Sequence, residues 1–145
     1  MDDPFDLLRF IRAQDPLWGN VLAELRRGRK ETHWMWFVFP QIRGLGLSAM
    51  SRRFAITGRE EAEAYLAHPV LGPRLNEVTA LVMGIERRSA HQIFGSPDDQ
   101  KLRSCMTLFA AVAPDGSIFQ AALRAYFAGQ SDPATLENCR WRRLR

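Results

Sequence analysis

Seven residues at positions 33–39, HWMWFVF, constrain the fold of this chain more than any other feature. They hold two of its four tryptophans and two of its nine phenylalanines. Each large aromatic side chain buries roughly 150 to 250 Å² in a folded protein. The block must therefore form either the centre of a hydrophobic core or the wall of a pocket.

The chain on both sides of this block has the periodicity of α-helices. Apolar residues recur three and four positions apart from Trp18 to Leu25 and from Leu71 to Ile85. Proline at a first helical position, or a capping Ser or Asp, begins these segments. The start signals stand at Pro4, Asp15-Pro16, Ser48, Ser89, Ser96-Pro97 and Asp132-Pro133. The end signals stand at Gly28, Pro69, Gly95 and Gly129.

The aromatic block itself fits either a buried strand or a buried helix. No other segment alternates with period two, so a strand would have no partner for its backbone groups. We therefore expect a buried helix that ends before Pro40, followed by a glycine-bearing loop over 41–47. Ser48 then caps a helix that runs through Ile56. The prediction is an all-α fold, a single compact domain of about seven to eight helices around one central buried aromatic helix.

Composition bounds the class of protein. A chain of 145 residues fits one domain, which we place at residues 1–138, with a loosely ordered basic C-terminal tail at residues 139–145. The acidic start MDDPFD and the lack of a long apolar run indicate neither a signal peptide nor a membrane span, so we expect a cytoplasmic protein without a membrane partner.

The net charge of +4 does not indicate nucleic-acid binding. Four arginines lie within RWRRLR at residues 140–145, and without them the rest of the chain is formally neutral. A nucleic-acid-binding domain usually carries its basic face on the folded body. The excess of arginine, 18 against two lysines, runs along the whole chain and is most simply attributed to genomic base composition.

Histidines and cysteines do not suggest a metal or cofactor site. Cys105 and Cys139 lack metal-ligand spacing, and no two histidines form a ligand pair such as HExxH. A hydrogen-bonded structural role is the simplest interpretation of each histidine. His33 is the best exception, because it precedes the aromatic block near a loop and an imidazole can transfer protons near neutral pH.

Two polar groups are candidates for a binding site. The loop after Pro40 carries Gln41 and Arg43 beside glycines, which permit close backbone approach to an anion. Farther along the chain, Asp98 and Asp99 precede Lys101 and Ser104 at a helix start. The alternative is structural: a loop that turns a corner, and acids that favour the positive end of a helix.

Three blocks of this sequence resemble a bacterial family, domain of unknown function 1810. They read KETHWMWFVFPQIRGLGLSAMSRRFAI, EAEAYLAHPVLGPRL and IFGSPDDQKLRSCMTLFAAV. The resemblance covers roughly residues 5–135 and implies a compact all-α domain without an established biochemical role. Members are sometimes labelled calpastatin, but such an inhibitor is a disordered repeat chain, which this composition does not match.

The resemblance also implies which residues to examine, because the three blocks hold polar residues beside aromatic ones, as pockets do. We take His33, Asp98 and Asp99 as candidate proton-handling residues. Candidate ligand-binding residues are Trp34, Trp36, Gln41, Arg43, Ser48, Tyr65, His68, Lys101 and Ser104.

Two functions remain open. The first is binding or processing of an anionic small molecule, such as a nucleotide or an ADP-ribose-like anion. The alternative is a non-catalytic protein interaction module that uses an aromatic surface or the arginine-rich tail. The sequence assigns neither a reaction nor an oligomeric state. A concave polar-rimmed site around the tryptophans favours the first function, and a flat apolar patch favours the second.

Overall fold

The structure of the chain, a computed structural model, describes residues 2–139, and their regular secondary structure is helical apart from one isolated bridge. Its buried apolar side chains form one continuous cluster, so the described residues share one core. The predicted all-α single-domain fold is confirmed. No helix within residues 2–139 is long and apolar enough to cross a membrane. The predicted tail lies outside the described residues except for Cys139, which is buried in the core.

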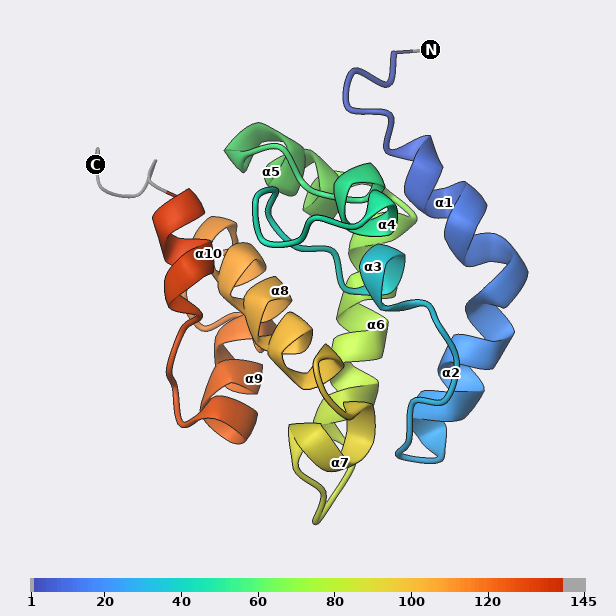
Figure 1. The fold of residues 1–145 in the computed structure, drawn as a ribbon, viewed down its shortest axis with the longest axis vertical. Coiled ribbons are helices and arrows are strands. Elements are labelled where there is room, and N and C mark those ends of the chain that lie inside the picture. Colours follow the sequence, from blue (N-terminus) through green and yellow to red (C-terminus); the bar gives the residue numbers. More distant parts are fainter. Residues whose placement is uncertain (1, 140–145) are drawn as a thin grey trace.

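The N-terminal part forms one bent rod along an edge of the molecule (Figure 1). It consists of α1 (Leu8–Gln14), the 3₁₀ turn η1 (Asp15–Leu17) and α2 (Trp18–Arg26). Pro4 does not begin the first helix as predicted. Instead the Asp3 carboxylate accepts hydrogen bonds from the N–H groups of Leu7 and Leu8, at 2.8 and 3.0 Å, so the helix begins later.

The aromatic block forms the short buried helix α3 (Met35–Val38), which ends before Pro40 as predicted. Trp34 and Phe39 flank it and are fully buried. The carbonyl of Phe37 accepts a hydrogen bond from the buried Gln14 side chain at 2.6 Å. This bond satisfies a backbone acceptor that a one-turn helix cannot pair internally.

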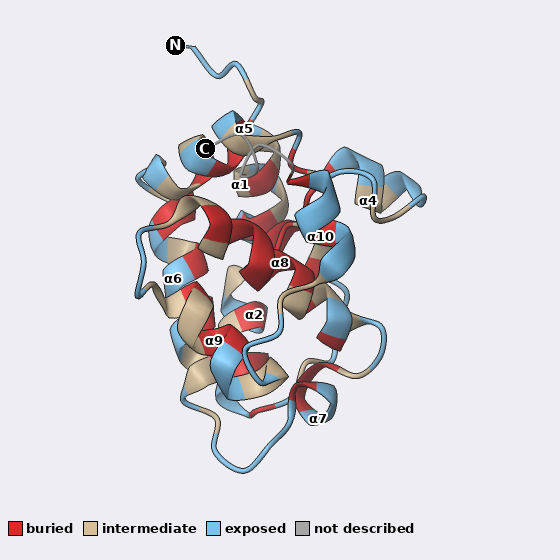
Figure 2. Ribbon diagram, turned by 90° about the vertical axis from the view of Figure 1, so that its left-hand side faces the viewer, coloured by how far each residue is buried: buried red, intermediate tan, exposed pale blue. Residues whose placement is uncertain are grey.

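The remaining helices complete a compact bundle. They are α4 (Ala49–Arg53), α5 (Arg59–Ala67), α6 (Leu71–Met83), α7 (Ala90–Phe94), α8 (Asp98–Val112), α9 (Ile118–Phe127) and α10 (Pro133–Asn138). The longest, α8, is buried over most of its length (Figure 2). It packs against α5, α7, α9 and α10, so it lies among four neighbouring helices.

Two helix boundaries differ from the sequence prediction. The helix that Ser48 caps ends at Arg53, because Ile56 instead pairs with Ile42 in the isolated parallel bridge. Ser96 does not cap α8: its hydroxyl donates to the Asp99 carboxylate, and Asp99 also accepts the Gln100 N–H at 2.9 Å. The predicted Ser89 cap of α7 is confirmed as a full capping box with Gln92.

The buried carboxylate of Glu24 holds the chain that leads into the aromatic block. Only 3% of this residue is exposed. It accepts hydrogen bonds from the Trp34 indole at 3.0 Å, from the N–H groups of Glu31 and Thr32, and from the Thr32 hydroxyl. Burial raises the pKa of Glu24, but these bonds outweigh it and hold the pKa below its ordinary value of 4.5.

Glu24→Gln should lower the free energy of unfolding by about 1–3 kcal/mol at pH 7, because a buried acceptor network loses its charge. Since the folded-state pKa is depressed, the stabilisation by Glu24 is present above about 4.5 and is lost as pH falls through the folded-state pKa. Urea unfolding between pH 7 and 3 should therefore show a flatter pH dependence in the variant. Glu31→Gln, at an exposed position, is the control and should change little. Equal pH dependence in Glu24→Gln and wild type would contradict this role.

Candidate functional site

A cleft of about 540 Å³ lies between the loop after α3 and the start of α8. Helix α4 and the segment before α10 complete its walls. The polar residues that line it are Gln41, Arg43, Ser51, Arg52, Gln100, Lys101, Ser104 and Asp132. Apolar lining comes from Trp36, Ile42, Leu45, Phe54 and Pro97, among others.

The loop wall of the cleft is held by backbone pairing and by glycine. The Arg43 N–H donates to the Ile56 carbonyl at 2.9 Å, and the Ile56 N–H donates to the Gln41 carbonyl at 2.8 Å. Gly44 then adopts a φ of +95°, a left-handed conformation that favours glycine. Gly46 lies against α4, where a Cβ would come 2.5 Å from the Ser51 hydroxyl oxygen.

Trp36 is the member of the aromatic block that reaches the cleft. Its neighbours Met35 and Phe37 are buried, whereas Trp36 is half-buried and lines the cavity. The ammonium nitrogen of Lys101 lies 5.0 Å from the centroid of the Trp36 ring, within the range of a cation–π contact. The cleft thus presents an aromatic ring and a cation together.

Asp132 is an acidic residue in the cleft lining, and its carboxylate already accepts hydrogen bonds from neighbouring residues. Its carboxylate caps α10 by accepting the N–H and hydroxyl of Thr135, at 2.9 and 2.5 Å. It also accepts the Ser104 hydroxyl at 3.2 Å. Among the described lining residues, the cations Arg43, Arg52 and Lys101 outnumber this acid, so the lining carries a net positive charge.

Two lysines meet at the first residue of α8. One oxygen of Asp98 lies 2.9 Å from the Lys30 ammonium, and the other lies 3.5 Å from that of Lys101. Lys30 is 6% exposed and Lys101 is 22% exposed. Asp99 faces a different group, because its carboxylate lies 3.4 Å from the Nδ1 of the exposed His91.

Of the predicted ligand-binding residues, five line the cleft together: Trp36, Gln41, Arg43, Lys101 and Ser104. The other four lie elsewhere. Trp34 and Tyr65 are fully buried in the core, where burial raises the pKa of the Tyr65 hydroxyl. Ser48 caps α4, and the His68 Nδ1 accepts the backbone N–H groups of Val70 and Leu71 at the start of α6.

The predicted proton-handling residues do not converge. His33 lies in an exposed bend before α3, whereas Asp98 and Asp99 lie in the first turn of α8 and bind Lys30 and His91. None of the three is among the described residues that line the cleft. In the part of the chain that the structure describes, no group of three or more His, Cys, Asp or Glu side chains is placed to hold a metal ion.

Lys30, Arg52 and Asp132 belong to the site or its support and are missing from the sequence prediction. Arg52 lies within α4, and the sequence marks Asp132 only as the start signal of a helix, so their convergence on the cleft depends on the tertiary fold. Lys30 did carry a signal. It and Lys101 are the two lysines in a chain with 18 arginines, and both contact Asp98.

Fold and site together define a small all-α single-domain protein whose described residues form a cationic cleft lined in part by Trp36. The chain belongs to the family described as protein of unknown function (DUF1810), whose model matches residues 4–139. Its structure is similar to that of the conserved hypothetical protein Rv1873 from Mycobacterium tuberculosis, with a TM-score of 0.93 and 52% identity. That match covers 94% of this chain and 98% of the Rv1873 chain. No curated protein matches the chain.

Gly46→Ala should lower the free energy of unfolding by about 1–3 kcal/mol, because the added Cβ overlaps Ser51 and the loop must shift. Combining it with Ser51→Gly should recover part of this loss. The control is Gly19→Ala in α2, where a Cβ meets no atom within 4 Å. That variant should gain about 0.5–1 kcal/mol from the helix preference of alanine. Urea unfolding measures the free energy of unfolding of all three variants. A Gly46→Ala variant as stable as wild type would show that the loop does not pack on α4 as described.

Proposed function

We propose that this protein binds an anionic small molecule in the cleft beside Trp36. The observation that carries the proposal is the convergence of Arg43, Arg52 and Lys101 on a cleft that the Trp36 ring also lines. Ligand sites are typically clefts of roughly 300–1,000 Å³ with apolar walls and a few polar groups, and a cleft of about 540 Å³ fits this description.

The lining favours a ligand that joins a planar group to an oxyanion. Trp36 offers a ring for stacking, and the Lys101 ammonium beside it offers a charge partner. Arg43 and Arg52 add guanidinium groups, which bind phosphate and carboxylate oxygens in pairs. Nucleotides and ADP-ribose-like anions have this combination, so we propose them as the ligand class.

We propose binding and assign no reaction. The candidate base His33 lies outside the cleft lining, and the carboxylates of Asp98 and Asp99 are engaged by Lys30 and by His91. A general acid or base must lie within hydrogen-bond reach of the reacting group. The cytoplasmic location predicted for this protein is compatible with such a ligand and stays a prediction.

A second candidate function, docking of a partner protein, rests on Leu47. This residue ends the loop over 41–47 and is 81% exposed, the largest exposed fraction among the large apolar side chains of the described residues. The tryptophans favour the first function: Trp34 is buried and Trp36 lies in a concave site, so neither forms a flat apolar patch.

A thermal-shift screen against pyrophosphate, ADP, ADP-ribose and citrate tests the proposal. A ligand at 100 times its Kd stabilises the folded state by about 2.7 kcal/mol, which raises the melting temperature measurably. Arg43→Met and Lys101→Met should each weaken binding about tenfold, because each removes a charged hydrogen-bond donor.

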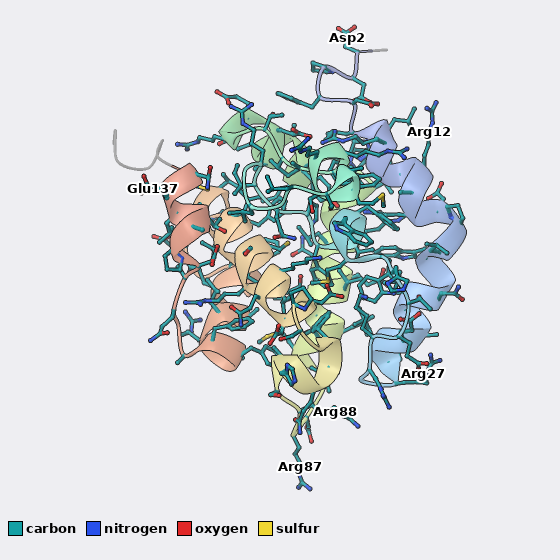
Figure 3. All side chains as sticks on the ribbon, in the orientation of Figure 1. Asp2, Arg12, Arg27, Arg87, Arg88 and Glu137 are labelled. Atoms are coloured by element: carbon teal, nitrogen blue, oxygen red, sulfur yellow. The ribbon has the colours of Figure 1, made fainter. Side chains whose placement is uncertain are left out.

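Arg12→Met is the matched control, because Arg12 lies on α1 at the outer edge of the molecule (Figure 3). It should leave every shift unchanged. A melting temperature that does not move with any of the four compounds, together with no heat of binding by calorimetry, would reject anion binding. The docking function would then be supported if Leu47→Ser abolished binding of a partner protein while the other variants still bound it.

A further inference from the structure

We propose that Lys30 and Asp98 together position Lys101 over Trp36 and keep its charge available to an anion in the cleft. This inference rests on the proposed function and concerns Lys30, which does not itself line the cleft. Lys30 and Asp98 are positioning residues in this proposal, and Lys101 is the residue that contacts the ligand.

The contacts form a continuous chain from the core to the cleft. The Trp34 indole binds the buried Glu24, and the Lys30 ammonium lies 5.0 Å from the centroid of the Trp34 ring. Lys30 binds Asp98 at 2.9 Å, and Asp98 contacts Lys101 at 3.5 Å. Lys101 in turn lies over the Trp36 ring. Trp34 and Trp36 thus each have one lysine ammonium over the ring, and both lysines contact the Asp98 carboxylate.

The Lys30 ammonium is buried and hydrogen-bonded, so it is not a freely exposed charge on the surface. Its side chain is 6% exposed, and its ammonium also donates a hydrogen bond to the Thr32 carbonyl at 2.6 Å. Its backbone N–H donates to the Ile93 carbonyl at 2.8 Å, which fixes the stem against α7. A buried ammonium needs such partners, because an unpaired one is costly away from water.

The charge balance explains why a second lysine is needed. A single pair of Lys101 and Asp98 would be neutral and would present no net charge to an anion. With Lys30 included, the three groups carry a net charge of +1. Because the shorter contact is to Lys30, the Asp98 charge is compensated from the buried side and Lys101 remains free to bind a ligand.

The composition of the chain agrees with this role. Basic positions are arginine 18 times and lysine twice, and the two lysines are these. An ammonium is a compact point charge, whereas a guanidinium is a wide planar fork. The chain uses both kinds of cation beside tryptophan rings: Arg74 lies over Trp18 and binds Asp15, whereas the two lysines share Asp98.

Nuclear magnetic resonance of lysine-labelled protein tests the positioning without a ligand. Isotope labelling of lysine gives two sets of side-chain signals, since the chain has two lysines. The Lys101 methylene protons should show an upfield shift from the Trp36 ring current, which Trp36→Leu removes. Asp98→Asn should abolish most of this shift, and Lys30→Met should change it by drawing Lys101 toward the unpaired carboxylate. Asp15→Asn, in the separate ion pair with Arg74, is the control and should leave both signals in place.

A double-mutant cycle with pyrophosphate tests the charge role. Lys30→Met should weaken binding about tenfold in wild type and less than about twofold in a Lys101→Met background, because its effect passes through Lys101. Lys30→Arg should restore part of the affinity by restoring the charge. If Lys30→Met fails to fold, Lys30→Gln removes the same charge while its amide keeps a donor for the Thr32 carbonyl.

The outcomes separate the two proposals. Lys101 signals that are identical in wild type, Lys30→Met and Asp98→Asn would overturn the positioning role, whatever the protein binds. Equal losses of affinity from Lys30→Met in both backgrounds would overturn the charge role while leaving anion binding intact. Absence of pyrophosphate binding to wild type, with the lysine signals moving as expected, would reject pyrophosphate as a ligand and retain the positioning role.

Discussion

The hydrogen bonds that converge on the buried Glu24 carboxylate are the interaction on which the rest of the structure depends. They fix the chain between α2 and α3, and they place the Trp34 indole in the core. With Trp34 fixed, the single turn of α3 turns Trp36 outward, toward the cleft. A charged acceptor is suited to this task because charge-assisted hydrogen bonds are stronger than neutral ones.

The cleft follows from two structural devices on the same side of the bundle. The loop after Pro40 is held at a fixed distance from α4 by the bridge between Ile42 and Ile56 and by the lack of a side chain at Gly46. Helix α8 packs against four neighbouring helices, and its first two turns present Lys101 and Ser104 to the cleft. A binding site formed by a short loop facing a rigid helix has little freedom to lose on binding, which favours affinity.

Much of the fold and part of the site could be predicted from the sequence. Helical periodicity and capping signals identified the all-α class and the cap at Ser89, because these depend on neighbours within a few residues. The buried helix before Pro40 was predicted because no other segment could pair with a strand there. The capping signals were wrong at two helix starts: the first helix does not begin at Pro4, and Ser96 does not cap α8. At both places a carboxylate, Asp3 or Asp99, accepts the backbone N–H groups that proline or serine was expected to organise. The choice among these acceptors depends on how the chain packs.

The sequence by itself determined that the aromatic block is buried and helical, and that polar residues after Pro40 and at the start of α8 are unusual enough to examine. Only the tertiary structure decided which of them meet. It brings Gln41 and Arg43 to Lys101 and Ser104, and it leaves His33 in an exposed bend away from the cleft. It also reveals the Lys30 to Asp98 contact across 68 residues of sequence, which no local pattern encodes. The physical reason is range: hydrophobic periodicity is a property of neighbouring residues, whereas a charge cluster forms only when packing brings distant side chains within a few ångströms of each other.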